Sequence, residues 1–331
     1  MRIVLDAMGS DNCPVPDVEG AVQAARESGE TIIIVGDKPS IERELAKYDI
    51  SGLQIEIVHA SQAVTMHDKP SQVAKAKPDS SMTVGMTLVR DGKADAFVSA
   101  GNTGAVLAIA TLQTLRRIPG VKRPALTSLI NVREKTIVLT DLGASPDARP
   151  EWLLQFGIMA GIYAEQVIGQ KNPRIAVLSN GEEEGKGNQV VRETSELFAK
   201  SGLNFVGNIE PKEMLAGHAD VIVADGFVGN IALKSMEALG DALFDLIRQE
   251  ITNAGPLAKV GAALVRPALR RVYRQVDPFE TGGAPLLGVN GVVIIGHGRT
   301  NAKGIKNAIF QARKAIQGNL IPAISKRMAR S

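Results

Sequence analysis

Short runs of aliphatic and β-branched residues alternate along the chain with amphipathic segments of helix length. Runs such as TIIIVG at 31–36 are apolar at every position, which is typical of strands buried on both faces of a parallel sheet. The alternation predicts an α/β fold with a doubly wound, mostly parallel sheet between two helical layers. The predicted strands are 2–6, 31–36, 53–59, 96–100, 126–132, 136–141, 175–180, 204–209, 221–225 and 292–296. The predicted helices are 15–28, 82–91, 105–115, 151–168, 189–201 and 231–251.

Polar and glycine-rich clusters follow four of the predicted strands. DAMGSD occupies 6–11, SAGNTG 99–104, NGEEEGKGN 180–188 and DGFVGN 225–230. Ligands of doubly wound folds bind where strands end and helices begin. We therefore expect the four clusters to meet in one crevice.

Two of these clusters, SAGNTG and DGFVGN, have the chemistry of an anion site. Their glycines let the backbone approach a ligand, and amides at the start of the next helix attract negative charge. Asn102, Thr103 and Asn230 add hydrogen-bonding side chains, and the alternative is that Asn102 or Thr103 only caps a helix. The candidate phosphate- and substrate-binding residues are Asp6, Gly9, Ser99, Gly101, Asn102, Thr103, Gly104, Asn180, Gly181, Asp225, Gly226, Gly229 and His297.

The NGEEEGKGN cluster places Lys186 between two glycines and beside three carboxylates. A lysine on a flexible loop can bring positive charge to a phosphate or to a developing oxyanion. The alternative is a solvated turn in which Glu183 or Glu184 pairs with Lys186. We predict Lys186, Asn230 and His59 as the catalytic residues, with His59 as a general base or proton donor.

The four histidines, His59, His67, His218 and His297, are not spaced as metal ligands, and Cys13 is the only cysteine, so no metal site is predicted. His297 lies between a strand and a helix, near Arg299 and Lys303, and is a candidate anion contact. For each histidine the alternative is a structural imidazole.

Composition limits the class of protein. The 331 residues are 44% hydrophobic and 22% charged, which is ordinary for a globular protein and fits one α/β domain over 1–331 or two closely packed lobes. A single cysteine forms no internal disulfide, and no stretch resembles a signal peptide or a membrane span, so we expect a cytoplasmic protein. A net charge of only +3 argues against nucleic acid as a partner.

The charge is unevenly distributed. Residues 255–331 hold 13 Lys and Arg against 2 Asp and Glu. Within 252–276 an apolar stripe at helical spacing accompanies a run of cations, and Pro267 predicts a break that would make this segment a basic amphipathic hairpin. We expect it to contact either an anionic membrane surface or a partner subunit. The residues concerned are Leu257, Val260, Leu264, Arg266, Arg270 and Arg271.

Several common catalytic motifs are absent. The chain has no Gly-x-Ser-x-Gly elbow, no GxGxxG after the first strand and no GxxxxGK[ST] loop. These absences disfavour acyl-serine chemistry and the usual modes of NAD and ATP binding.

Taken together, the motifs DAMGSD, SAGNTGA, NGEEEGKGN, ADGFVGN, GGAPLLGVNG and GHGRTNAKGIKNAI resemble the bacterial phosphate acyltransferase family of phospholipid synthesis, over 2–315. Ser10 and Ser145 depart from it, since the family usually has Gly and Asn there.

The resemblance implies a homodimer with a fold similar to isocitrate and isopropylmalate dehydrogenases and phosphotransacetylases. It implies transfer of a fatty acyl group from acyl carrier protein to inorganic phosphate, with no metal, nucleotide or redox cofactor. The acyl phosphate would pass to a membrane glycerol-3-phosphate acyltransferase, which fits a cytoplasmic protein attached peripherally to the membrane. Two alternatives remain open: a small-acyl phosphotransacetylase or dehydrogenase of the same fold, and a non-catalytic scaffold at the membrane surface.

Overall fold

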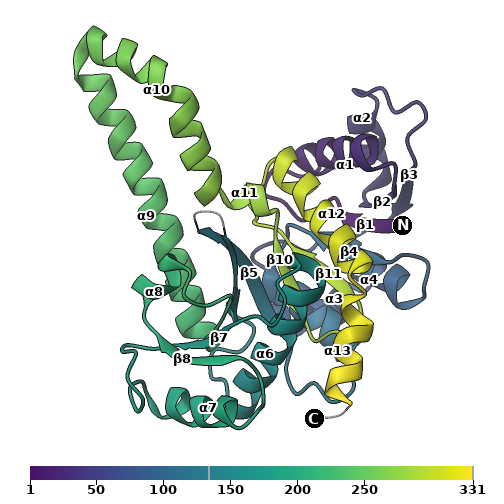
Figure 1. Cartoon of the computed structure of the whole chain (residues 1–331). Helices are drawn as coiled ribbons and strands as arrows, with labels where there is room; N and C mark the ends of the chain where they lie inside the picture. The colour runs from purple at the N-terminus through teal and green to yellow at the C-terminus, as the bar shows by residue number, and fades with distance from the viewer. Residues whose placement is uncertain (133–134, 330–331) are drawn as a thin grey trace.

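The computed structural model describes residues 1–132 and 135–329. Within these residues, eleven strands form one sheet in the order β3–β2–β1–β4–β11–β10–β5–β6–β9–β7–β8, with helices on both faces (Figure 1). The predicted α/β fold with a mostly parallel sheet is confirmed.

Five strands of the first half of the sheet are mutually parallel. They are β1 (Arg2–Asp6), β2 (Thr31–Gly36), β3 (Ile55–His59), β4 (Ala96–Ser99) and β11 (Val292–Ile295). All five were predicted, with small differences at their ends. Side chains alternate along β1, so that Ile3 and Leu5 enter one core and Val4 enters the other.

Most strands of the second half of the sheet run in the opposite direction. β11, β10 (Ala284–Leu287), β5 (Ala125–Val132) and β6 (Lys135–Thr140) are joined by three successive antiparallel pairings. β6 is then parallel to β9, β9 to β7, and β7 to β8. These last three strands are β7 (Ile175–Leu178), β8 (Phe205–Ile209) and β9 (Val221–Val223).

This reversal bears on two predictions. β10 was missed because it is only four residues long and contains Pro285, so its sequence has no strand pattern. The expectation that the four clusters meet in one crevice rested on a shared edge of the sheet, which the strand directions contradict, so their meeting stays a prediction. The strands that precede NGEEEGKGN and DGFVGN, β7 and β9, point opposite to β1 and β4, which precede the other two clusters.

Each face of the sheet has its own hydrophobic core, and both cores extend across the two halves. The helices on one face are α1 (Val15–Ser28), α2 (Lys38–Leu45), α6 (Pro150–Tyr163), α7 (Gln189–Ala199), α12 (Ala302–Gln317) and α13 (Leu320–Met328). The other face holds α3 (Pro70–Ala76), α4 (Ser81–Arg90), α5 (Thr103–Ala108) and α8 (Pro211–Ala216). π-helical turns extend α5 over Ile109–Gln113 and α6 over Ala164–Ile168, and α11 (Pro278–Thr281) is a single turn.

A long helical hairpin projects from this body (Figure 1). It consists of α9 (Gly226–Asn253) and α10 (Gly255–Val276). A hairpin was predicted within 252–276, and the position of its turn is therefore wrong. The chain reverses at Ala254 and Gly255, where Gly255 has a φ of +85°, whereas Pro267 lies inside α10, whose axis bends but continues. None of the described helices is both long and apolar enough to cross a membrane.

The contact between α1 and α12 gives a prediction about stability. A Cβ added at Gly20 would lie 2.5 Å from Ile305 Cβ and 2.7 Å from the backbone oxygen of Ala302. We expect Gly20→Ala to lower the free energy of unfolding by about 1–3 kcal/mol, because the two helices would have to separate. Denaturant unfolding would measure the change.

Gly240→Ala is the matched control, since Gly240 lies inside α9 with no atom within 4 Å of an added Cβ. There the helix propensity of alanine should raise stability by up to about 1 kcal/mol. Equal effects of the two substitutions would contradict close packing of α1 against α12.

Candidate active site

A buried carboxylate joins the first two clusters. Asp6, at the end of β1, is fully buried and accepts a 2.7 Å hydrogen bond from Ser99 Oγ, at the end of β4. Its other oxygen accepts the amide of Met8, and Ser99 Oγ accepts the amide of Gly101 at 3.1 Å. Burial raises the pKa of Asp6. The carboxylate thus fixes both loops at the same edge of the sheet.

The two loops meet through their glycines. A Cβ at Gly9 would lie 2.8 Å from the amide nitrogen of Gly101 and 2.9 Å from Ser99 Oγ. A Cβ at Gly101 would overlap Met82 and lie 3.2 Å from the Cα of Gly9. Glycine is required at both positions because backbone packs directly against backbone.

Asn102 is engaged within the protein at both ends of its side chain. Its Oδ1 caps α5 by accepting the amide of Ala105. Its Nδ2 donates to backbone oxygens of Thr65, Met66 and Asp68, at 3.3–3.4 Å. The side chain therefore ties the loop after β3 to the start of α5, and its predicted direct contact with an anion stays a prediction. Thr103 and Gly104 are the first residues of α5, and Gly104 packs against Pro70.

The loop after β11 brings His297 to this edge. The amide of Asp11 donates to the carbonyl of Gly298 at 2.9 Å, which connects the His297 loop to DAMGSD. The pKa of His297 is lowered, mainly by burial and then by the positive charge of Lys234 on α9, with Glu237 acting in the opposite sense. Near neutral pH we therefore expect a neutral imidazole. Lys234 and Glu237, which were not among the predicted site residues, show that α9 passes close to this loop.

A second buried carboxylate organises the start of α9. Both oxygens of Asp141, just after β6, accept backbone amides, from Leu126, Leu142, Ala144 and Ser145, at 2.7–3.2 Å. Burial raises the pKa of Asp141 to about 6.

The first turn of α9 lies directly on this Asp141 loop. A Cβ at Gly226 would lie 2.8 Å from Asp141 Oδ2, and one at Gly229 would overlap the Asp141 carbonyl oxygen. Asp225 caps α9 by accepting the amides of Phe227 and Val228. Asn230 is exposed, one turn of helix before Lys234. Asp141 was not among the predicted site residues, although it follows a strand as Asp6 does.

The NGEEEGKGN loop lies at the end of β7, apart from the first two clusters. Asn180 Oδ1 accepts the amide of Gly187, and the stem of Lys186 lies against Gly181. Lys186 itself is exposed, and no described carboxylate forms an ion pair with it. Glu182 pairs instead with Lys212, at 3.2 Å. The predicted alternative in which Glu183 or Glu184 neutralises Lys186 is therefore not what the structure contains.

The described contacts of His59 involve none of the other candidate site residues. It ends β3, the edge strand, and its Nδ1 accepts the backbone amide of Lys38 at 3.3 Å. Its charged neighbours are Asp37 and Asp79. No described contact links it to the glycine loops, so its catalytic role stays a prediction without geometric support.

Ser10 contacts a third buried carboxylate, that of Asp17. Its Oγ donates to Asp17 Oδ2 at 2.5 Å, and Asp17 Oδ1 is buried without a partner among the described residues. Burial raises the pKa of Asp17 to about 7, although the hydrogen bond from Ser10 acts in the opposite sense. Cys13 is nearby, and its thiol pKa is raised by burial and by the charge of Asp17. A thiolate is therefore disfavoured, which argues against Cys13 as a nucleophile.

Known proteins resemble the chain over nearly its full length. A family model described as "Fatty acid synthesis protein" matches residues 1–322. Phosphate acyltransferase of Geobacter sulfurreducens is 45% identical over 329 residues, covering 99% of this chain and 94% of that protein. Phosphate acyltransferase of Syntrophotalea carbinolica is 45% identical over 314 residues, covering 95% and 90%.

Solved structures with the same fold are more distant in sequence. A phosphotransacetylase from Streptococcus pyogenes has a TM-score of 0.61 at 20% identity and covers 100% of this chain and 94% of its own. A branched-chain phosphotransacylase from Enterococcus faecalis has a TM-score of 0.56 at 15% identity, covering 95% and 99%. A 4-hydroxythreonine-4-phosphate dehydrogenase from Klebsiella pneumoniae has a TM-score of 0.54 at 15% identity, covering 96% and 99%. At these identities the likeness establishes the fold alone.

The raised pKa of Asp17 predicts a pH-dependent contribution to stability. Between about pH 4 and 7 the folded protein retains a proton that the unfolded chain has lost, so stability falls as pH rises through this window. Asp17→Asn removes this dependence and keeps an acceptor for Ser10. We expect the variant to gain stability relative to the wild type from pH 5 to 8, measured by denaturant unfolding. If the unfolding free energies of the wild type and the variant changed in parallel over this pH range, a protonated Asp17 would be contradicted.

Proposed function

The chain belongs to the fatty acid synthesis protein family, whose curated relatives are named phosphate acyltransferase, and we propose that it transfers a fatty acyl group from acyl carrier protein to inorganic phosphate. Membership makes it a transferase enzyme. The proposed products are acyl phosphate and free carrier protein. The observation that supports this reaction best is the junction of two glycine loops at Gly9 and Gly101, beside the His297 loop.

Phosphate needs little chemical activation by the protein. It is already a nucleophile near neutral pH, so the enzyme has to hold it, align it with the thioester and stabilise the tetrahedral oxyanion. Gly9 and Gly101 let the two loops pack directly against each other, which holds the loop backbones and the start of α5 in fixed positions beside the proposed anion site. The imidazole of His297, held at this edge by the Asp11–Gly298 hydrogen bond, adds a polar group.

Lys186 is the proposed source of mobile positive charge. It lies on an exposed loop with glycines on both sides, and both Gly185 and Gly187 have a φ of +91°. No described carboxylate holds its ammonium group, so the side chain is available to an anion. No described contact joins its loop to the Gly9–Gly101 junction, and the approach of Lys186 to the bound phosphate is part of the proposal. Asn230, exposed in the first turns of α9, is the proposed amide donor from the second half of the sheet.

The hairpin supports two further proposals, a homodimer and peripheral attachment at the cytoplasmic face of an anionic membrane. On α10, Leu257 and Leu264 are 85% and 78% exposed, with Val260 on the same stripe. On α9, Leu239 is 71% exposed and lies on a stripe with Leu243 and Leu246. Apolar surface of this extent is expected to be covered. We assign the α9 stripe to a second copy of the chain and the α10 stripe, nearest the turn, to the membrane.

This arrangement fits an apolar product that must reach a membrane enzyme. The proposed consumer is a glycerol-3-phosphate acyltransferase in the membrane, and a long-chain acyl phosphate would move to it with little exposure to water.

Phosphate-dependent thioester cleavage tests the proposed reaction. Purified protein mixed with long-chain acyl carrier protein should release free carrier only when inorganic phosphate is added. Acetyl-CoA in place of the carrier substrate should react far more slowly. Equal rates would favour a small-acyl phosphotransacetylase, and no cleavage of either thioester would favour a scaffold.

The same assay examines Lys186. Lys186→Ala should reduce the rate by about 10²–10³-fold, the usual loss when one charge-stabilising contact in the transition state is removed. Lys200→Ala, a matched change at the exposed end of α7, should have no effect. Wild-type turnover by a folded Lys186→Ala protein would remove the residue from the mechanism.

The membrane assignment is tested by Leu257→Glu combined with Leu264→Glu. We expect the double variant to lose sedimentation with anionic phospholipid vesicles while its dimer and soluble activity are retained, because carboxylates do not enter the membrane interface. Leu112→Glu with Leu215→Glu, on two exposed leucines outside the hairpin, is the control. Dissociation of the first variant into monomers would show that the α10 stripe is a subunit contact.

A further inference from the structure

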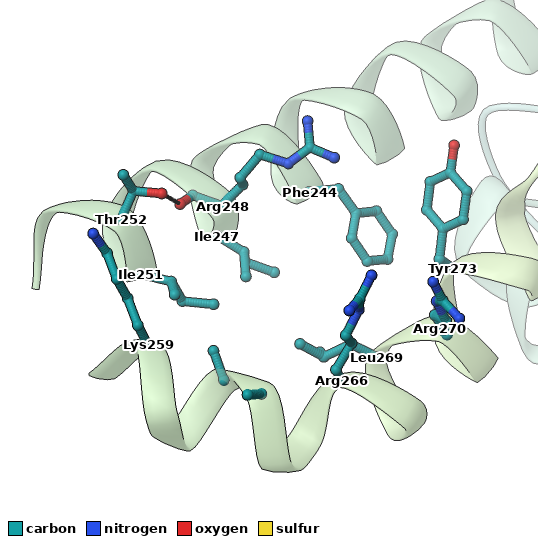
Figure 2. Close-up of a pocket in the computed structure, with 12 residues that line it drawn as sticks. Phe244, Ile247, Arg248, Ile251, Thr252, Lys259, Arg266, Leu269, Arg270 and Tyr273 are labelled. Atoms are coloured by element: carbon teal, nitrogen blue, oxygen red, sulfur yellow. Dashed lines mark hydrogen bonds between the residues drawn. The ribbon is translucent and has the colours of Figure 1, made fainter. Parts of the chain in front are cut away.

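A cavity separates the two helices of the hairpin (Figure 2). Its volume is about 460 Å³. The lining residues are Phe244, Ile247, Arg248, Ile251 and Thr252 of α9, and Lys259, Ala262, Ala263, Arg266, Leu269, Arg270 and Tyr273 of α10. Each set follows helical spacing, so one face of each helix lines the cavity. This volume lies within the range of about 300–1,000 Å³ that is typical of small-molecule sites.

The sequence of α10 accounts for the space. Ala262 and Ala263 stand where larger side chains would fill the gap to α9. Pro267 lies one turn further along α10, and a proline inside a helix is a usual cause of a bend. Nearer the body of the protein the gap is closed by Phe244 and Tyr273, whose rings meet edge to face with centroids 5.1 Å apart. The Phe244–Tyr273 contact therefore closes the end of the cavity that is nearer the body of the protein.

The lining combines two kinds of chemistry. Phe244, Ile247, Ile251 and Leu269 provide an apolar wall. Arg248, Lys259, Arg266 and Arg270 provide four cations, of which only Arg248 has an ion-pair partner in the described part of the chain, Asp245 at 3.7 Å.

Two of the arginines that were predicted to contact a membrane or a partner subunit line this cavity, and that predicted contact stays a prediction. Arg266 and Arg270 were expected to act together with the apolar stripe of Leu257 and Leu264. The structure places these two arginines on the face of α10 that looks towards α9, whereas Leu257 and Leu264 are absent from that lining. Arg271 is not part of the lining either.

We propose that this cavity binds a single-chain anionic amphiphile, with its head group at Arg266 and Arg270 and its tail along the apolar wall. The inference rests on the proposed function, because the long-chain acyl phosphate product belongs to this chemical class. Guanidinium groups bind phosphate oxygens well, and an apolar chain fits a wall with few polar atoms. The site would hold the product on the element that we assign to the membrane.

A second copy of the chain is a poorer occupant of this face. In a twofold dimer the same surface patch meets itself. The four cations would then face four identical cations, which costs free energy unless anions intervene. The charge of the lining therefore favours a small anionic ligand.

Calorimetric titration of the full-length protein with dodecyl phosphate, below its micelle concentration, tests the site. We expect saturable binding of one molecule per chain. Inorganic phosphate should not compete for it, and dodecyltrimethylammonium should bind much more weakly because its head group is positive. Equal binding of the cationic and anionic amphiphiles would overturn the proposal.

Three variants locate the binding. Ala262→Phe with Ala263→Phe fills the cavity, and Arg266→Gln with Arg270→Gln removes two cations, so each pair should weaken binding by about tenfold or more. Arg271→Gln with Lys314→Gln removes two charges outside the lining and is the matched control. Equal losses in the control, or unchanged affinity in the filled variant, would contradict the site. A change in mass by light scattering in the filled variant would identify the cavity as a subunit contact instead.

The acyl-transfer assay on the same preparations separates this inference from the proposed reaction. Transfer without binding of dodecyl phosphate would overturn the cavity site alone. Binding without any transfer would overturn the proposed reaction, and the cavity would remain a site for anionic amphiphiles.

Discussion

The pairing of β10 determines how the rest of the molecule is arranged. This strand of four residues bonds to β11 through Ala284 and Pro285 and to β5 through Leu286 and Leu287. Together with the β5–β6 pairing it reverses the direction of the second half of the sheet. Loops that follow the strands of the two halves therefore point in opposite directions. α9 starts on the Asp141 loop and passes close to His297, so it connects the two sets of loops.

The two halves use the same device to hold their loops. Asp6 follows β1 and Asp141 follows β6, and both are buried. Each accepts backbone amide hydrogen bonding from its own loop and a hydrogen bond from one donor on another strand, Ser99 Oγ for Asp6 and the amide of Leu126 for Asp141. A buried carboxylate is costly unless such donors surround it, and the donors in turn keep the loops fixed. Glycines at 9 and 226 are required because the loops approach these carboxylates more closely than a Cβ allows. Rigid glycine loops are thus a consequence of buried charge.

The sequence predicted features that depend on local pattern and missed those that depend on distant pairing. α1 was predicted with its observed ends, because its apolar spacing and the glycine at 29 are local signals. The direction of β7 and β9 was not predictable, since it depends on which strands pair across the sheet. The turn of the hairpin was misplaced because Pro267 is a strong local signal for a break. In the structure α10 meets α9 there only across a cavity, so a bent helix is accommodated.

α10 presents different residues on its two faces, which matters for how an apolar product leaves the protein. The glycine loops suit a compact anion, not a long acyl chain. A helix has room for two functional faces, and here Leu257 and Leu264 are exposed while Arg266 and Arg270 line the cavity. Contact of the leucines with a membrane would leave the cavity unobstructed, because the two faces are separated around the helix. The cavity and the exposed leucines lie on the same hairpin. A ligand bound in the cavity would therefore be held on the element that is proposed to contact the membrane.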